Sequence, residues 1–426
     1  MLDLKFIRAD AERVRRGLDA KNVRHELDRI LALDEERRNL LLQVERKKAE
    51  RNQRSQEVPK LKAAGEDASA LLADMKRLAE EIRQDDERVR AVEAELESLL
   101  AWIPNLPHAS VPVGPDASAN QEIRRWGEPG SLAARPRPHW EIAEELRLLD
   151  FQKGARLSGS GFVVFLGAGA RLRSALIRFM LDRHVRAGDL EVSAPYIVRR
   201  DCMFGTGQLP KMEEDMYRVD LDDLFLIPTA EVSITNLYRG ELLAEEQLPI
   251  RLAGYSPCFR REAGTYGKET RGLVRLHQFD KVELVRLVKP ETSYDELERL
   301  TAAAEGVLQA LELPYRVLNL ASGDLSFSSA KTYDLEAWAP AEGRWLEVSS
   351  CSNFEAFQAR RIGVRYRTAA GKVEYPHTLN GSGLALPRVI VALLEVHQTE
   401  HGSVRIPAAL RPYLGGLEEL APEPGR

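Results

Sequence analysis

Two long stretches without glycine or proline dominate the first quarter of the chain. Residues 19–58 and residues 66–101 contain neither, whereas Pro59 and Gly65 both fall in the short gap between them. Because proline and glycine are the usual interrupters of helices, this pattern predicts two long helices joined by one turn. A helix of about 32 residues extends roughly 48 Å, at ~1.5 Å per residue. We therefore expect an antiparallel helical hairpin, which is too thin to hold a pocket.

The second stretch carries an apolar seam. Its members are spaced by alternating threes and fours, the a/d pattern of a coiled coil, and one acid interrupts them. They are Met75, Leu78, Ile82, Asp85, Val89, Val92, Leu96 and Leu99. The first stretch has a sparser seam, made of Leu27, Ile30, Leu41 and Val44 and diluted by Asp34 and Arg37. We expect the two seams to pack against each other.

Basic residues gather toward the predicted tip of the hairpin. Between residues 46 and 62, seven lysines and arginines face two glutamates, a local charge of +5 in a chain whose formal net charge is −5. Any polyanion must be met by such a local patch, because the chain as a whole is not basic. A solvated coiled-coil surface is the alternative interpretation of a charge run.

Composition indicates a globular protein of a reducing compartment. The 426 residues are 44% hydrophobic, and this length suggests about two or three domains. The chain has an odd number of cysteines, and they are widely spaced: Cys202, Cys258 and Cys351. This pattern argues against a disulfide framework. The N-terminal segment lacks the apolar core of a signal peptide, and no apolar run approaches the ~20 residues that span a bilayer. We expect a soluble cytoplasmic protein.

A proline-rich segment marks the end of the hairpin. The segment from Trp102 to Pro115 contains four prolines, counting Pro115, and prolines at this density are typical of a linker. We assign residues 1–103 to an N-terminal domain, residues 104–120 to a linker and residues 121–426 to a globular domain.

The globular domain has the pattern of an α+β fold with a mainly antiparallel sheet. Strand-like runs and helical stretches are interspersed without regular βαβ alternation. The strand-like runs include residues 225–228, 315–320 and 344–350, and the helical stretches include residues 170–185 and 294–311.

Several segments of this domain carry residues suited to chemistry. In FRRE (259–262), the alternation of strand side chains would place Arg260 and Glu262 on one face of a strand. An arginine can brace a phosphate while a carboxylate accepts a hydrogen bond. Alone, such a triplet is more often a surface ion pair.

Three further segments add polar groups. TLNGSGLALPR (378–388) places Arg388 at the start of an apolar helix, which suits an anion, although an ordinary first-turn arginine would look the same. PTAEV (228–232) and EVSSCSNF (347–354) add carboxylates and hydroxyls that could hold an ammonium group or a hard metal ion.

Taken together and in order, these segments resemble the bacterial seryl-tRNA synthetases, which are class II aminoacyl-tRNA synthetases. GDLEVSAPYIV (188–198) is similar to motif 1, residues 259–283 are similar to motif 2, and TLNGSGLALPR is similar to motif 3. GTGQLPK (205–211), PTAEV and residues 347–361 resemble blocks particular to the seryl enzymes. The resemblance covers the chain from end to end, hairpin included.

The resemblance implies an α+β class II catalytic domain, built on an antiparallel sheet and preceded by an antiparallel coiled-coil hairpin. It implies a serine–tRNA ligase that activates L-serine with ATP and transfers it to the 3′ end of tRNA(Ser), and of selenocysteine tRNA where one exists. Mg²⁺ would accompany ATP. The enzyme would be a cytoplasmic homodimer, assembled through motif 1 and without a membrane partner.

The resemblance also implies the roles of individual residues. Serine would be held by Thr229, Ala230, Glu231, Glu283 and Ser382. ATP would be held by Arg260, Arg261, Glu262, Phe279, Glu347, Val348, Ser349, Ser350 and Arg388, of which Arg260 and Arg388 would be catalytic. Glu262 would bind the edge of adenine, whose ring would lie between Phe279 and Arg388. Glu347 and Ser350 would ligate the metal. The tRNA would be held by Arg46, Lys47, Lys48, Arg51 and Arg54.

Two positions depart from the family pattern. Gly161 stands where an arginine is common, and Pro387 stands where many members have glycine. Two other functions would also be compatible with parts of the sequence. An adaptor protein with a degenerate synthetase-like domain conflicts with the workable chemistry at every motif position, and a ligase for a non-tRNA carrier conflicts with the basic-tipped hairpin.

Overall fold

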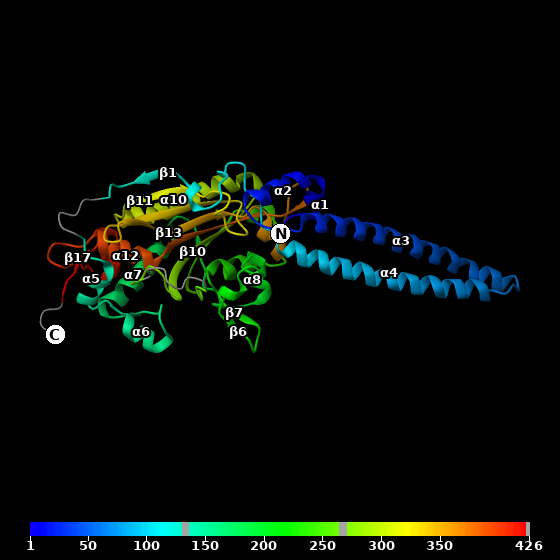
Figure 1. Ribbon diagram of the computed structural model, residues 1–426, viewed down its shortest axis with the longest axis horizontal. Coiled ribbons are helices and arrows are strands. Elements are labelled where there is room, and N and C mark those ends of the chain that lie inside the picture. Colours follow the sequence, from blue (N-terminus) through cyan, green and yellow to red (C-terminus); the bar gives the residue numbers. More distant parts are fainter. Residues whose placement is uncertain (130–135, 264–270, 423–426) are drawn as a thin grey trace. The chain divides into compact units, whose positions relative to one another are not determined.

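The computed structural model describes residues 1–129, 136–263 and 271–422 (Figure 1). It divides into two units. The first comprises residues 1–19 and 23–104, and the second comprises residues 20–22 and 105–426. Within the described ranges, no helix is long and apolar enough to cross a membrane.

The first unit is helical. Its helices are α1 (Leu4–Ala9), α2 (Ala11–Ala20, whose last residue falls in the second unit), α3 (Leu27–Ala63) and α4 (Ser69–Ala101). The long pair α3 and α4 forms the predicted hairpin, and the two helices run side by side (Figure 1).

The boundaries of the first long helix differ from the prediction in two places. Pro59 lies inside α3, where a proline near the helix end removes one backbone donor without stopping the last turn. The chain reverses instead at Gly65, whose φ of 75° suits glycine. At the other end, the predicted helix from residue 19 is broken between α2 and α3, where Asn22 adopts a φ of 55°. Asparagine tolerates this conformation, so the break has no glycine or proline signal.

The apolar seam of the hairpin is mostly as predicted, with shifts of one residue. On α4 the buried residues are Leu78, Ile82, Val89, Val92, Leu96 and Leu100. Leu100 thus replaces Leu99. On α3, Leu40 is buried whereas Leu41 is 37% exposed, which corrects the predicted seam. Spacing alone left the choice between adjacent leucines open, and the rotation of each helix against its partner decides it.

The acids that interrupt the seam are paired. Asp34 is 1% exposed and accepts hydrogen bonds from Arg8 at 2.8 Å and Arg38 at 3.2 Å. Asp85 of α4 accepts a hydrogen bond from Lys47 of α3 at 2.7 Å. These cations allow polar residues to occupy seam positions, because a buried charge is tolerated when it is paired.

The second unit is built on an eight-stranded sheet, which confirms the predicted α+β fold. Its strand order is β1 (Gln121–Trp126), β11 (Tyr315–Asn319), β12 (Lys331–Ala339), β13 (Arg344–Asn353), β16 (His377–Ala385), β10 (Gln278–Val288), β9 (Ile250–Phe259) and β4 (Leu190–Glu191). Every pairing is antiparallel except that of β4 with β9.

The two faces of the sheet carry different side chains at the centre of β10, apolar on one face and polar on the other. Val282 and Leu284 of β10 belong to a large apolar core that includes residues of α7 (Gly167–Arg186), α10 (Ser293–Ala310) and α12 (Leu386–Val396). All residues of α12 except Arg388 and Val396 are buried, as expected for a helix that is apolar at every position except Arg388 and Glu395. Because strand side chains alternate, Lys281 and Glu283 of β10 point to the opposite face.

Shorter elements surround the sheet. The remaining α-helices are α5 (His139–Glu145), α6 (Phe151–Ser158), α8 (Arg200–Thr206), α9 (Ala230–Thr235) and α11 (Phe357–Ile362). The predicted strand at residues 225–228 is β7 (Leu224–Leu226), which lies between β5 (Ile197–Arg199) and β6 (Arg218–Val219). The other small sheets contain β2 (Leu149–Asp150) and β3 (Val164–Phe165), β17 (Val404–Arg405) and β18 (Glu419–Leu420), and β15 (Val373–Glu374), β14 (Arg365–Arg367) and β8 (Leu242–Ala244).

Candidate active site

A cavity of about 500 Å³ in the second unit brings together most of the predicted site residues. Those that line it are Thr229, Glu231, Arg260, Glu262, Phe279, Glu347, Val348, Ser349, Ser350, Ser382 and Arg388. Ala230, Arg261 and Glu283 do not line it. Ala230 packs in an apolar cluster instead, and Arg261 is exposed beside the cavity.

Thr229 and Glu231 lie at one end of the cavity because α9 begins there. Thr229 is the N-cap of α9, and its Oγ1 accepts a hydrogen bond from the Glu231 N–H at 3.2 Å. Capping of this kind holds the first turn of a helix in place. The Glu231 carboxylate accepts a 2.7 Å hydrogen bond from the Gln358 side chain.

Glu283 lies beneath this end of the cavity and is covered by two residues that the sequence analysis missed. Lys281 Nζ is 2.5 Å from Glu283 Oε2, and Asn380 Nδ2 donates to Glu283 Oε1 at 3.2 Å. Both Lys281 and Asn380 line the cavity, whereas Glu283 is fully buried. A signal existed for Lys281, since residues two apart on a strand share a face.

The charges at this end are not balanced. Lys281 also donates to Thr229 Oγ1 at 2.9 Å, so one ammonium serves a region with two buried carboxylates, Glu231 and Glu283. Burial, and then the neighbouring Glu283, raise the pKa of Glu231 to about 7. Burial also raises the pKa of Glu283, although Lys281 opposes the shift. A second cation, such as an amino acid's ammonium group, would neutralise the remaining carboxylate charge.

At the other end, Arg260 and Glu262 do not share a strand face, which corrects the prediction. β9 ends at Phe259. The Arg260 N–H still continues the β9–β10 register, since it bonds to His277 O at 2.8 Å, but the Arg261 N–H bonds to Asp215 O at 2.9 Å and so leaves the sheet. Glu262 then adopts a φ of 52°. Both side chains still line the cavity.

Contacts within the site hold these side chains in place. The Arg260 guanidinium lies over the Phe279 ring, 5.2 Å from its centroid. The Glu262 carboxylate accepts a hydrogen bond from Arg275 at 2.5 Å. Arg275 also lines the cavity and is another residue that the sequence analysis missed. The remainder of the predicted motif 2 loop, residues 264–270, lies outside the described residues.

Arg388 enters the cavity from the first turn of α12. Its guanidinium donates to Glu347 O at 2.9 Å and to Val274 O at 3.2 Å. Pro387, a departure from the family pattern, occupies the first turn of α12, where helices tolerate proline because its missing N–H has no intrahelical partner.

Glu347 and Ser350 both face the cavity, although residues three apart on a regular strand point to opposite faces. A β-bulge explains this. Leu335 pairs with Ser349 while Glu336 pairs with Glu347, so Val348 is the extra residue on β13. A bulge of this kind re-aims the side chains that follow it. The carboxylate and the hydroxyl are hard oxygen donors of the type that Mg²⁺ prefers.

Gly161, the second departure, is required by its surroundings. It has a φ of 80°, and a Cβ at this position would lie 2.4 Å from the His277 ring. His277 also donates its N–H to Gly161 O at 3.0 Å. A larger residue here would displace His277, which contacts Arg260 O through its ring.

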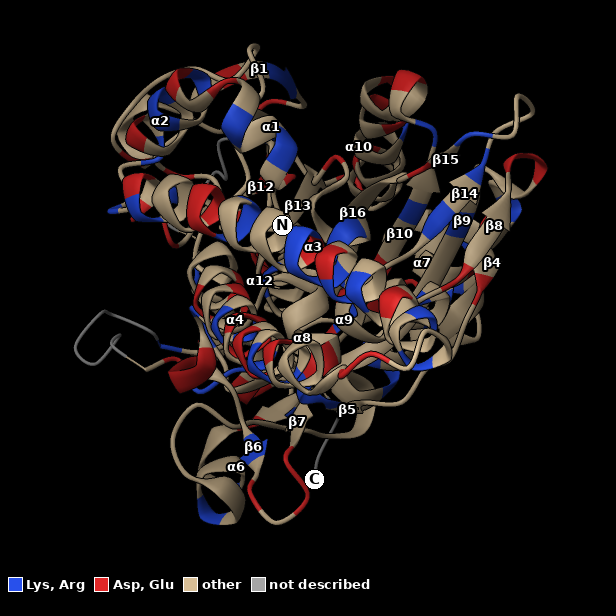
Figure 2. Cartoon of the chain, turned by 90° about the vertical axis from the view of Figure 1, so that its right-hand side faces the viewer, with Lys and Arg blue, Asp and Glu red and all other residues tan. Residues whose placement is uncertain are grey.

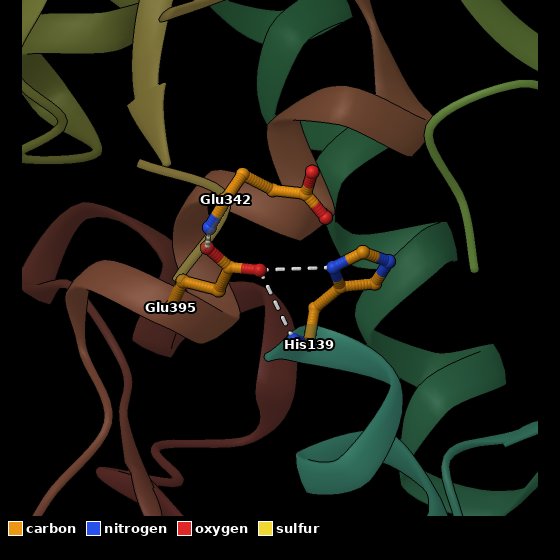
Figure 3. A group of neighbouring side chains, drawn as sticks. All are labelled: His139, Glu342 and Glu395. Carbon is orange, nitrogen blue, oxygen red and sulfur yellow. Dashed lines mark hydrogen bonds and ion pairs between the residues drawn. The ribbon is translucent and has the colours of Figure 1, made fainter. Parts of the chain in front are cut away.

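A buried group near the cavity has the composition of a metal site but is saturated by hydrogen bonds. His139, Glu342 and Glu395 place ligand atoms within 4.8 Å of one another (Figure 3). His139 Nδ1 lies 2.9 Å from Glu395 Oε1, and His139 Nε2 accepts the Leu273 N–H at 3.1 Å. Glu395 also accepts the N–H groups of His139, Ala341 and Glu342. The group therefore joins α5 and α12 to a cavity-lining segment around Leu273.

The five hairpin residues predicted to bind tRNA divide into two sets. Lys47 pairs with Glu81 and Asp85, Lys48 pairs with Asp86, and Arg54 pairs with Glu50 and Asp74. Arg46 and Arg51 form no ion pair with any residue that the structure describes. The count of +5 covered one arm alone, and residues 63–85, which form the turn and the start of the other arm, hold six acids and three bases. Figure 2 shows both signs of charge along α3 and α4.

Comparison with known proteins agrees with the fold and the motifs. Residues 1–107 match the seryl-tRNA synthetase N-terminal domain, and residues 215–397 match the tRNA synthetase class II core domain (G, H, P, S and T). The serine–tRNA ligase of Caldicellulosiruptor saccharolyticus is 55% identical, over 97% of this chain and 99% of its own length. That of Geobacillus kaustophilus is also 55% identical, over 99% of this chain and 100% of its own.

A solved structure gives the same result in three dimensions. The seryl-tRNA synthetase of Pyrococcus horikoshii, crystallised with ATP, has a TM-score of 0.94 and 39% sequence identity. The match covers 99% of this chain and 100% of that one. The chain belongs to the seryl-tRNA synthetase family of class II aminoacyl-tRNA synthetases.

Proposed function

We propose that the chain is a serine–tRNA ligase that forms seryl-adenylate from L-serine and ATP and then transfers serine to tRNA(Ser). One observation carries the proposal. A single cavity has an under-neutralised carboxylate pair at one end and two arginines, Arg260 and Arg388, on its walls. An amino acid's ammonium group suits the first end, and a triphosphate suits the arginines.

The first step needs no general base, because the carboxylate of serine is already ionised at neutral pH. Arg260 would bridge this carboxylate and the α-phosphate, and Arg388 would bind the phosphates that leave as pyrophosphate. Positioning and charge neutralisation then supply the catalysis. Glu262 would accept from adenine, and Phe279 would support its ring.

Glu347 and Ser350 fit a divalent ion, because both line the cavity with hard oxygen donors. We propose that they hold Mg²⁺, which would neutralise phosphate charge when it is bound with ATP. In the second step a terminal ribose hydroxyl of tRNA would attack the seryl carbonyl of the adenylate. The bond between this carbonyl and the phosphate oxygen would break, so that AMP leaves, and the phosphate of AMP would take the hydroxyl proton.

Serine must be distinguished from alanine, which lacks the hydroxyl, and from threonine, which adds a methyl group. An unpaired buried polar group rejects the former strongly, whereas one methyl is worth only about 1–3 kcal/mol without rigid walls. We propose that Ser382 and the Glu283 network read the hydroxyl, and that Thr229 and Glu231 form the rest of the serine site. Ala230, which packs in an apolar cluster, would hold these two residues in place from the first turn of α9.

The division of labour follows the predicted domains. We propose that residues 1–103 bind tRNA, through Arg46 and Arg51 first, and that residues 121–426 form the catalytic domain after a linker at 104–120. We also propose a cytoplasmic homodimer assembled through residues 188–198.

Two assays test this function. The protein should support ATP–pyrophosphate exchange with serine and should then charge tRNA(Ser). Exchange without charging would identify a ligase for another carrier. Absence of both activities would identify an adaptor protein.

A further inference from the structure

Asp334 of β12 forms no ion pair with any lysine or arginine in residues 1–129, 136–263 and 271–422. It lies opposite Ser350 of β13 in the sheet, and its Oδ1 is buried and has no hydrogen-bond partner among the described residues. The groups that act on it electrostatically are the Ser350 hydroxyl and the carboxylates of Glu347, Asp324 and Glu336.

A buried carboxylate oxygen without a partner costs free energy unless a cation or a hydrogen-bond donor lies beside it. A buried charge is normally paired, and an orphaned buried oxygen often marks the place of an ion. The neighbouring acid Glu336 provides a contrast, because it receives a 2.6 Å hydrogen bond from Arg316. No arginine or lysine among the described residues forms a comparable ion pair with Asp334.

The location of Asp334 indicates which cation is missing. The bulge at Val348 brings Glu347 and Ser350 to the same side, and Asp334 lies directly across the strand pair from Ser350. Arg388 reaches Glu347 but forms no ion pair with Asp334. A divalent ion held by Glu347 and Ser350 would therefore be the first positive charge beside Asp334.

We propose that Asp334 is a third member of the divalent-ion site, a positioning residue whose carboxylate stabilises the ion that Glu347 and Ser350 hold. The proposal rests on the function proposed above. Groups that support metal ligands in this way typically change metal affinity by about 10- to 100-fold when they are removed.

The test is Mn²⁺ binding to the full-length protein with a non-hydrolysable ATP analogue, followed by electron paramagnetic resonance. Asp334→Asn should weaken Mn²⁺ binding by about 10- to 100-fold, with the affinity for the analogue alone unchanged. Its thermal midpoint without metal should equal or exceed that of the wild type, because the substitution removes an acid whose charged form is disfavoured by burial. Glu336→Gln, which removes an already paired acid from the same strand, should leave Mn²⁺ affinity unchanged.

Mn²⁺ affinity within twofold of wild type in Asp334→Asn would overturn the proposal, as would equal losses in both variants. Asp334→Ser provides the same comparison if the asparagine variant does not fold. Failure of the proposed function is distinguishable, because the wild-type protein would then lack serine-dependent exchange.

Discussion

Lys281 and Glu283, two residues apart on β10, form a buried ion pair in which Nζ lies 2.5 Å from Oε2. Lys281 faces the cavity and Glu283 lies behind it. The carboxylate that the family pattern assigns to serine is thus engaged by a lysine of the same strand. In the function proposed above, serine would therefore meet a network at this end of the cavity and not one carboxylate.

Lys281→Met should raise the KM for serine far more than the KM for ATP. Without the lysine, the buried Glu283 would lose its ion-pair partner, and Arg260 would act on Glu283 and Glu231 only from a distance. Breaking a buried pair in this way typically costs about 3–5 kcal/mol. Pyrophosphate exchange and thermal unfolding measure the two effects. Lys289→Met, which breaks a half-exposed pair with Glu245, is the control. An unchanged KM for serine would remove Lys281 from the site.

Serine affinity should increase as the pH rises through about 7. The pKa of Glu231 is raised to about 7, so this carboxyl is protonated at lower pH and cannot attract an ammonium group. Serine binding below pH 7 should also release a proton. Calorimetry in buffers of different ionisation enthalpy measures both quantities. The pH dependence should disappear in Glu231→Gln, and its persistence there would assign it to another group.

The same carboxyl should lower folding stability as the pH rises. A raised pKa means that the folded state binds the proton more tightly than the unfolded state does. The contribution of Glu231 is therefore favourable below its ordinary pKa of 4.5 and is lost by about 7. Denaturant titrations of wild type and Glu231→Gln should diverge over this interval, and parallel profiles would contradict the prediction.

Arg260→Ala should nearly abolish serine-dependent pyrophosphate exchange while the fold remains intact. The arginine faces charge that develops during transfer, and loss of one such donor costs about 2.7–4 kcal/mol. Arg125→Ala, on the edge strand β1, is the control. Exchange within threefold of wild type in Arg260→Ala would exclude the proposed role.

His139→Ala should raise the KM for ATP while the KM for serine changes little. The substitution leaves the Leu273 N–H without its acceptor, a loss that costs about 1–3 kcal/mol. Glu395 loses only its contact with the ring and keeps the backbone N–H groups of residues 139, 341 and 342. Residues 273–276 line the cavity beside Arg388 and would shift with Leu273. His401→Ala, an exposed histidine, is the control. Equal increases in both KM values would indicate general destabilisation.

Deletion of residues 35–95 with closure of the gap should spare adenylate formation and impair tRNA charging. A coiled coil has no pocket for serine or ATP but can present cations to a phosphate backbone. Arg46→Gln and Arg51→Gln should each reduce the salt dependence of tRNA binding by about one slope unit. Arg83→Gln, whose arginine pairs with Glu80 and Glu87, is the control. Loss of exchange in the deletion variant would make the hairpin a folding element.

Local patterns in the sequence determined the elements and the chemistry. The absence of glycine and proline predicted α3 and α4, and alternating apolar residues predicted β11 and β13. The motif segments contain most of the residues that line the cavity, and eleven of these residues were named individually. These signals are readable because helix and strand periodicity, and the chemistry of a side chain, are properties of neighbouring residues.

Only the tertiary structure decided how those residues meet. In the structure Leu40, and not Leu41, is buried in the seam. Acids of α4 form ion pairs with bases of α3, and Glu262 has a backbone conformation that no strand adopts. The tertiary structure also placed Lys281 in front of Glu283 and used a bulge to bring Ser350 beside Glu347. Each outcome depends on pairing between segments distant in the chain, and the periodicity of one segment carries no information about its partner's register or charge.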